Sequence, residues 1–124
     1  MRTAAQRAGD AAEASVAAYL ERFGWRVLGR RIRVGRAELD LVAVDPGPSP
    51  TLVVVEVRWR SRRDFGLPEE TVDHRKRARL RRAASSLRAS GLLPDGTALP
   101  ALPLRFDLIV VEPGDRLRHY RHGA

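Results

Sequence analysis

Two stretches of alternating residues flank a proline-rich loop in the middle of the sequence and constrain the fold more than any other feature. They read "AELDLVAV" at 37–44 and "LVVVEVRWR" at 52–60. Successive side chains point to opposite faces of a strand, so each stretch predicts a strand with one apolar face, which in the first holds Leu39 and Leu41. Three prolines and a glycine exclude regular structure from the loop at 45–51. We therefore expect an antiparallel hairpin.

The register of this hairpin follows from placing Val44 opposite Leu52, at the two ends of the loop. Asp40 then faces Glu56 across the two strands. A shift by one residue would set charged side chains against the apolar face of the partner strand, which burial disfavours. The sequence therefore predicts two carboxylates side by side on one face of the sheet.

Two facing carboxylates need an explanation, because like charges directly opposite each other destabilise an antiparallel pair. A divalent cation would supply one, since Mg²⁺ binds one or two protein carboxylates and completes its shell with waters and phosphate oxygens. Such an ion polarises a phosphate and lowers the pKa of a bound water. The alternative is that Asp40 and Glu56 are ordinary sheet residues neutralised by Arg58 and Arg60.

The rest of the chain predicts two helices and two further strands within one domain spanning residues 1–124. The apolar residues of the first helix recur at helical spacing, and a glycine follows it. The last strand has an apolar run typical of burial on both faces. We expect a helix at 4–23, an edge-like or bent strand at 25–34, an exposed loop at 61–70, a helix at about 71–90, a strand at 104–112 and a weakly patterned tail at 113–124.

Composition favours a nucleic acid as the partner. The 124 residues carry 23 basic and 15 acidic side chains, a net charge of +8, and only one of the basic residues is a lysine, Lys76. The absence of cysteine excludes disulfides and thiolate metal sites. No apolar run is long enough for a membrane span and the start lacks the apolar region of a signal peptide, so we expect a cytoplasmic protein.

Five segments in order resemble the YraN-like family of small bacterial proteins, which are predicted endonucleases of the PD-(D/E)xK superfamily. The segments are "GDAAEASVAAYLERFGWRVL", "RAELDLVAV", "VVVEVRWRS", "VDHRKRARLRRAA" and "LRFDLIVVE". The resemblance implies a restriction-endonuclease-like and Holliday-junction-resolvase-like α/β fold, with an α-β-β-β-α-β core and a mixed sheet flanked by helices. It also implies Mg²⁺ or Mn²⁺ as cofactor and DNA as substrate, either branched or single-stranded, in repair or recombination.

The resemblance assigns roles to individual residues. It makes Asp40 and Glu56 the metal ligands, and Glu13 matches an acidic residue that resolvase-like members carry on the first helix. The alternative for Glu13 is a solvated helix glutamate. Glu38 is either an outer acid of the site or the partner of Arg58, and we favour the partner role.

Arg58 departs from the superfamily pattern, which has lysine at this position. An arginine stays protonated and cannot act as a general base, although its planar group can hold a phosphate. The family's "VD..K" segment places a lysine at Lys76, which helical spacing sets on the inward face of the second helix. Lys76 therefore either reaches the phosphate or the attacking water, or it extends from the apolar seam to solvent.

Arginines of the second helix and of the loop before it are the expected nucleic-acid-binding surface, because they can neutralise phosphates. Their alternative is an ordinary solvated face. The same fold without cleavage would be a nucleic-acid-binding module, an alternative that Arg58 motivates, and the sequence leaves a homodimer open. The expected contact residues are Arg60, Arg62, Arg63, Arg75, Arg77, Arg79 and Arg82.

Overall fold

Seven elements make up the computed structural model, which describes residues 3–60 and 74–122. The predicted loop at 61–70, with Arg62 and Arg63, lies outside the described residues. The elements are α1 (Ala4–Arg22), β1 (Arg26–Val34), β2 (Ala37–Asp45), β3 (Thr51–Trp59), α2 (His74–Ser90), β4 (Leu104–Glu112) and β5 (Arg116–Arg121).

The five strands form one mixed sheet in the order β1-β2-β3-β4-β5. Strands β3 and β4 are parallel, and the other neighbouring pairs are antiparallel. The predicted α/β class and the order of the first six elements are confirmed. Strand β5 corrects the prediction of a weakly patterned tail, because it pairs with β4 from Asp107 to Glu112.

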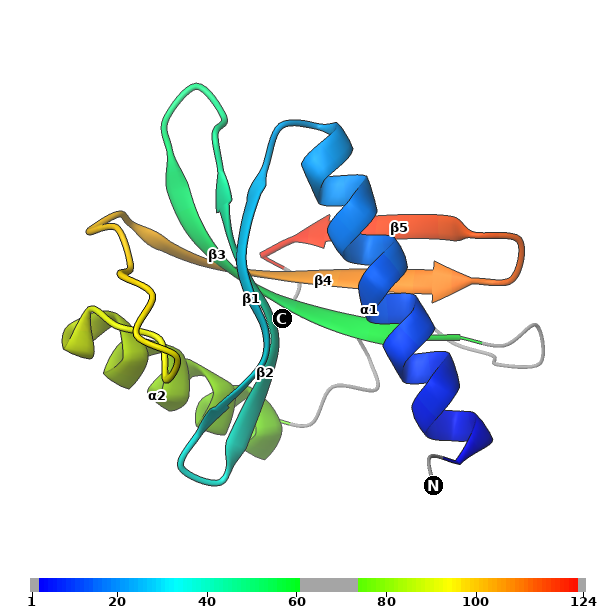
Figure 1. Cartoon of the computed structure of the whole chain (residues 1–124), viewed down its shortest axis with the longest axis horizontal. Helices are drawn as coiled ribbons and strands as arrows, with labels where there is room; N and C mark the ends of the chain where they lie inside the picture. The colour runs from blue at the N-terminus through cyan, green and yellow to red at the C-terminus, as the bar shows by residue number, and fades with distance from the viewer. Residues whose placement is uncertain (1–2, 61–73, 123–124) are drawn as a thin grey trace.

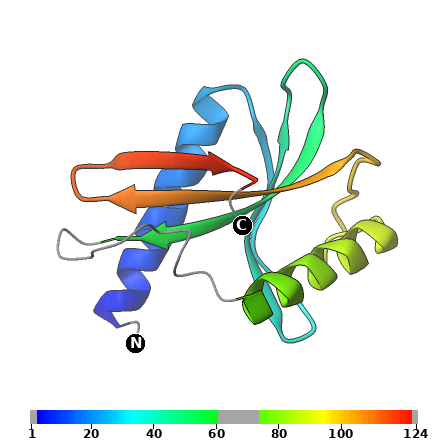
Figure 2. The ribbon, with the colours of Figure 1, turned by 180° about the vertical axis from the view of Figure 1, so that it is seen from behind.

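The two helices pack against opposite faces of the sheet (Figures 1 and 2). Val16 and Leu20 of α1 belong to a buried cluster with Val53 of β3. Ala84 and Leu87 of α2 belong to a second buried cluster, on the other face. The strand β4 is buried on both sides, as its apolar run predicts. None of the described helices is long and apolar enough to cross a membrane.

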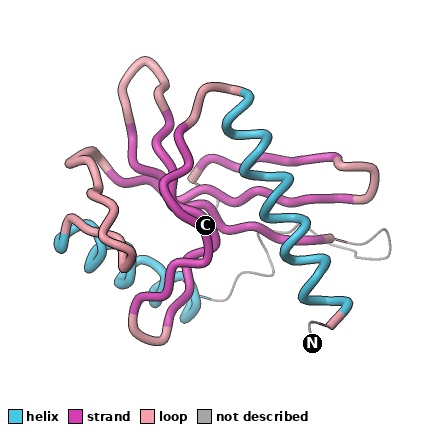
Figure 3. Tube along the Cα trace, in the orientation of Figure 1, coloured by secondary structure: helices cyan, strands magenta, loops and turns pink. Residues whose placement is uncertain are grey.

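The predicted register of the β2–β3 hairpin is confirmed, with Val44 opposite Leu52. Pairing ends at Leu41 opposite Val55, one step before Asp40 and Glu56. Beyond that point β2 turns with β1 toward α2, whereas β3 continues beside β4 under α1 (Figures 1 and 3). We call the space where the two strands diverge the fork.

The divergence coincides with an irregularity in β1. Arg31 has a φ of 52°, in the left-handed region, and it lies level with Asp40 between the pairs Arg30–Leu41 and Ile32–Leu39. Such a conformation costs a non-glycine residue on the order of 1–3 kcal/mol. Across this point the alternation of side chains fails, because Leu41 packs in the cluster under α1 and Leu39 in the cluster under α2. The prediction that both leucines share a face was wrong.

Candidate active site

Asp40 lies in the fork, where its carboxylate takes the place of a backbone partner. Its Oδ2 accepts a hydrogen bond from the backbone N–H of Val57, 2.9 Å away. The same register would set Asp40 opposite Glu56 and then Leu39 opposite Val57, but the strands have already separated. The side chain of Asp40 therefore satisfies a donor that the diverging β2 backbone has left.

Glu56 lies on the α2 side of β3, as the alternation of that strand predicts. Its side chain is only 5% exposed, and its Oε1 accepts a hydrogen bond from the Lys76 ammonium at 2.7 Å. The Arg58 guanidinium lies 3.6 Å from the same oxygen. Oε2 is buried and accepts no hydrogen bond within the described part of the chain.

Lys76 reaches Glu56 because of its place on α2. The buried residues Ala83, Ala84 and Leu87 hold the later turns of the helix against the sheet. Lys76 lies in the first turn of the helix on the same stripe, two turns before Ala83 and Ala84 and three turns before Leu87. The Lys76 ammonium contacts Glu56 while its side chain stays 45% exposed, and contact with a phosphate or with the attacking water stays a prediction.

A small cavity joins these side chains. Its volume is about 40 Å³, which accommodates roughly three waters at 10–15 Å³ each. Residues of β2 and β3 line one part of it, and residues of α2 and β4 line the rest. The cavity is lined by Glu38, Leu39, Asp40, Val54, Val55, Glu56, Lys76, Leu80 and Phe106.

The surroundings of Asp40 raise its pKa from 3.8 to about 6. Burial is the largest cause, and the hydrogen bond from Val57 opposes it. The negative charge of Glu56 raises the pKa further, whereas Lys76 lowers it. Asp40 is therefore neutral below about pH 6 and becomes available as an anionic ligand above it.

The donor set of the cavity fits a divalent cation that keeps part of its shell for other ligands. Asp40 and Glu56 supply two carboxylates, and the buried Oε2 of Glu56 is a free acceptor among the described residues. The described residues contain no group of three or more histidine, aspartate or glutamate side chains placed to hold an ion. Two carboxylates are enough for Mg²⁺, which binds one or two of them together with waters and substrate phosphates.

Glu13 lies outside the cavity, whereas Glu38 lies in its lining, where its alternative role as an outer acid of the site would place it. Glu13 accepts a hydrogen bond from Arg31 at 2.7 Å and does not line the cavity. Glu38 lines the cavity but lies 3.9 Å from Arg33, whereas Arg58 lies beside Glu56. The pair that we favoured, between Glu38 and Arg58, is replaced by an ion pair of Glu38 with Arg33 and one of Arg58 with Glu56.

The arginines of α2 are spread around the exposed side of the helix. Arg75, Arg79 and Arg82 line one shallow concave surface, and Arg77 is half-buried. Arg60 follows β3 directly, close in sequence to Arg58, and its backbone N–H donates to the carbonyl of Val111. The arginines of the helix therefore flank the turn that carries Lys76.

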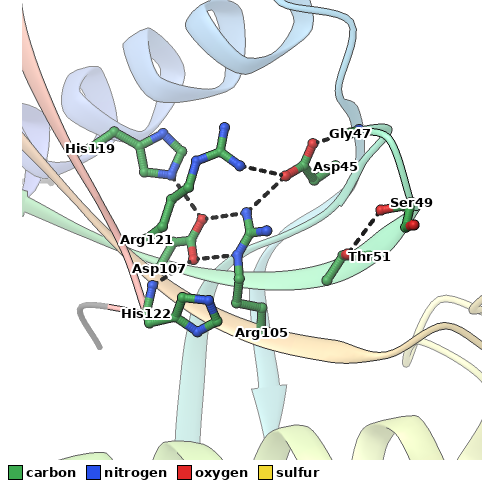
Figure 4. A network of polar contacts seen from close by, with 9 residues as sticks. All are labelled: Asp45, Gly47, Ser49, Thr51, Arg105, Asp107, His119, Arg121 and His122. Carbon is green, nitrogen blue, oxygen red and sulfur yellow. Dashed lines mark hydrogen bonds and ion pairs between the residues drawn. The ribbon is translucent and has the colours of Figure 1, made fainter.

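A second polar cluster, which the sequence revealed only in part, lies at the other end of the sheet (Figure 4). Arg105 donates to both oxygens of Asp107, which is its same-face neighbour on β4. The same guanidinium also bonds Asp45, and His119 lies 2.8 Å from Asp107. The partners Asp45 and His119 were missed because they come from other strands. This cluster joins the β2–β3 hairpin to β4 and β5.

The fold and the site together define a class of protein. An α-β-β-β-α-β arrangement with a mixed sheet and helices on both faces is that of the restriction-endonuclease-like α/β proteins, here with one added strand. The model of the uncharacterised protein family UPF0102 matches residues 12–111. The chain belongs to this family, which is the YraN family, so the resemblance seen in the sequence is confirmed.

Two relatives in this family match this chain over most of their own length. A UPF0102 protein of Symbiobacterium thermophilum is 40% identical over 88% of this chain and 85% of its own. One of Xanthomonas campestris is 39% identical over 100% of this chain and 95% of its own. Among solved structures, that of Pyrococcus furiosus SfsA in complex with Ca²⁺ matches 94% of this chain and 63% of its own, with 14% identity and a TM-score of 0.32. A TM-score this low does not establish a shared fold.

Proposed function

We propose that this protein is a metal-dependent DNA endonuclease that hydrolyses phosphodiester bonds in branched or single-stranded DNA. One observation carries the proposal: Asp40, Glu56 and Lys76, from three different elements, line the same cavity. An acid pair alone also suits an ordinary sheet. The half-buried Asp40 beside the buried Glu56, the Lys76 ammonium 2.7 Å from Glu56, and a buried Glu56 oxygen that accepts no hydrogen bond from the described residues suit a site for an ion and a phosphate.

Asp40 and Glu56 would hold Mg²⁺ or Mn²⁺ through their carboxylates. The bound ion supplies Lewis acidity toward a phosphate and makes a water more acidic. Lys76 then provides a positive charge beside the scissile phosphate, where it stabilises the charge that develops during the reaction. Arg58 stays protonated and orients a phosphate oxygen with its planar group.

The test is incubation of the purified protein with branched, nicked, single-stranded and duplex DNA in Mn²⁺, Mg²⁺ or a chelator. We expect cleavage that requires the metal and disappears in Asp40→Ala/Glu56→Ala. A matched control is Glu21→Ala/Glu112→Ala, which changes net charge equally and leaves the cavity intact. Cleavage that survives in the first variant would remove the proposed site from the reaction.

The second candidate function is a nucleic-acid-binding module on the same fold without cleavage. The ion pair between Lys76 and Glu56, together with arginine in place of lysine at position 58, favours it. In that case the protein would bind DNA with similar affinity with and without metal. Binding without cleavage across all of these substrates and metals would decide for this candidate.

A further inference from the structure

The conformation of Arg31 is unusual for a residue inside a strand. Its φ of 52° lies in the left-handed region, where the Cβ of an L-residue approaches the following carbonyl too closely. Glycine and asparagine visit this region routinely, and long side chains do so only where their surroundings hold them. We therefore asked which contacts hold Arg31.

Two carboxylates of α1 hold the Arg31 guanidinium. Its Nη2 forms an ion pair with Asp10, and its Nε donates to Glu13 at 2.7 Å. Asp10 and Glu13 are three residues apart, so they are neighbours on the surface of the helix. Glu13 is nearly buried, with a side chain only 12% exposed. We call this set of three residues the α1 clamp.

The position of Arg31 connects the α1 clamp to the fork. Arg31 lies level with Asp40 on the neighbouring strand. Leu41, the residue after Asp40, faces α1, whereas Leu39, the residue before Asp40, faces α2. The face that β2 presents to each helix therefore changes at Asp40. The turn takes β2 away from β3 and leaves the Val57 N–H to the Asp40 carboxylate.

We propose that Arg31 is a positioning residue, held in its left-handed conformation by Asp10 and Glu13, which opens the fork and thereby places the Asp40 carboxylate. This gives Glu13 a role different from the one implied by the family resemblance, because it acts on Asp40 through Arg31. A catalytic role for this placement of Asp40 rests on the proposed function. The link from the α1 clamp to the Val57–Asp40 hydrogen bond does not, because it follows from the contacts and the strand register.

Hydrogen exchange of individual backbone amides measures this link without any cleavage. The Val57 amide reports on the bond to Asp40. The amides of Val53 and Val55 point to the same side of β3 and remain within the paired ladder. The ratio of protection at Val57 to protection at Val53 therefore separates the geometry of the fork from the stability of the whole sheet.

Asp10→Asn/Glu13→Gln removes the charges of the clamp while keeping similar shapes. We expect the protection ratio to fall by about fivefold, as for the loss of one hydrogen bond. Adding Arg31→Gly to this variant should restore the ratio, since glycine adopts the left-handed conformation without a clamp. An unchanged ratio in the double variant, or failure of the glycine to restore it, would overturn the proposal.

Single substitutions of Arg31 test the same link without touching α1. Arg31→Asn removes the clamp but tolerates the left-handed region, so the ratio should remain near that of the natural protein. Arg31→Val disfavours this region strongly, so the ratio should fall. Equal ratios in these two variants would contradict the proposal. If neither the natural protein nor any variant cleaves DNA, the proposed function is wrong. The exchange ratios still decide the positioning role of Arg31 in that case.

Discussion

The two carboxylate oxygens of Glu56 lie in different surroundings. Oε1 faces Lys76 and Arg58, whereas Oε2 is buried and accepts no hydrogen bond from the described residues. A buried acceptor without a partner costs about 1–3 kcal/mol. Such an oxygen calls for an explanation, and a bound ion is one of those known for buried acceptors. A cation at Oε2 would remove this cost.

Lys76 contributes little to stability in its present contact, because its side chain is 45% exposed and ion pairs near solvent are worth about 0–1 kcal/mol. We expect Lys76→Met to reduce cleavage by about 100-fold or more, as for the loss of one transition-state donor. Mn²⁺ affinity, measured by calorimetry, should stay largely unchanged. Arg26→Met, at an exposed position of β1 away from α2, is the matched control. Full activity of the Lys76 variant would exclude the residue from the mechanism.

At the scale of elements, the cluster around Asp107 holds β4 and β5 to the β2–β3 hairpin. Asp107 is fully buried, and burial alone would raise its pKa. Hydrogen bonds from His119, Arg105 and the backbone of His122 outweigh burial and lower the pKa to about 2. The charged form of Asp107 is therefore the one that the folded protein stabilises.

This lowered pKa predicts a loss of stability in acid. A carboxyl whose pKa falls on folding stabilises the protein fully above its unfolded pKa of 3.8 and loses this contribution as the pH falls toward 2. The shift corresponds to about 2 kcal/mol. Urea unfolding of the natural protein and Asp107→Asn should show a stability difference that narrows between pH 4 and pH 2. The exposed Asp115→Asn is the control, and a difference independent of pH would contradict the prediction.

Elements with a clear apolar period were predictable from the sequence. The β2–β3 register could be predicted because a shift would bury charge, and this register brings Asp40 and Glu56 close together. Strand β5 could not be predicted, since "RLRHYR" is an edge strand with arginine at half of its positions and only weak apolar alternation. The turnover at Arg31 could not be predicted either. An arginine gives no local signal for a left-handed backbone, and the contacts that hold it come from α1.

At the scale of the whole molecule, positive charge is in excess and part of it is gathered beside the candidate active site. The net charge is +8, and exposed arginines of α2 lie on the helix whose first turn carries Lys76. Such groups attract a polyanion without reading its sequence, because they replace the counterions of the phosphates. The arginines of α2 would then orient the approaching DNA, and the residues at the fork would carry out the chemistry.

This arrangement predicts where the salt dependence of DNA binding originates. Each arginine that neutralises a phosphate contributes about 0.9 to the slope of log affinity against log salt for duplex DNA, and about 0.7 for single strands. Arg79→Ala/Arg82→Ala should therefore reduce the slope by about 1.4–1.8, measured by fluorescence anisotropy without metal so that no cleavage occurs. Arg26→Ala/Arg30→Ala removes the same charge from the exposed positions of the edge strand β1, and the slope should remain unchanged. Equal losses in the two variants would mean that net charge alone attracts DNA, and α2 would then have no special part in orienting it.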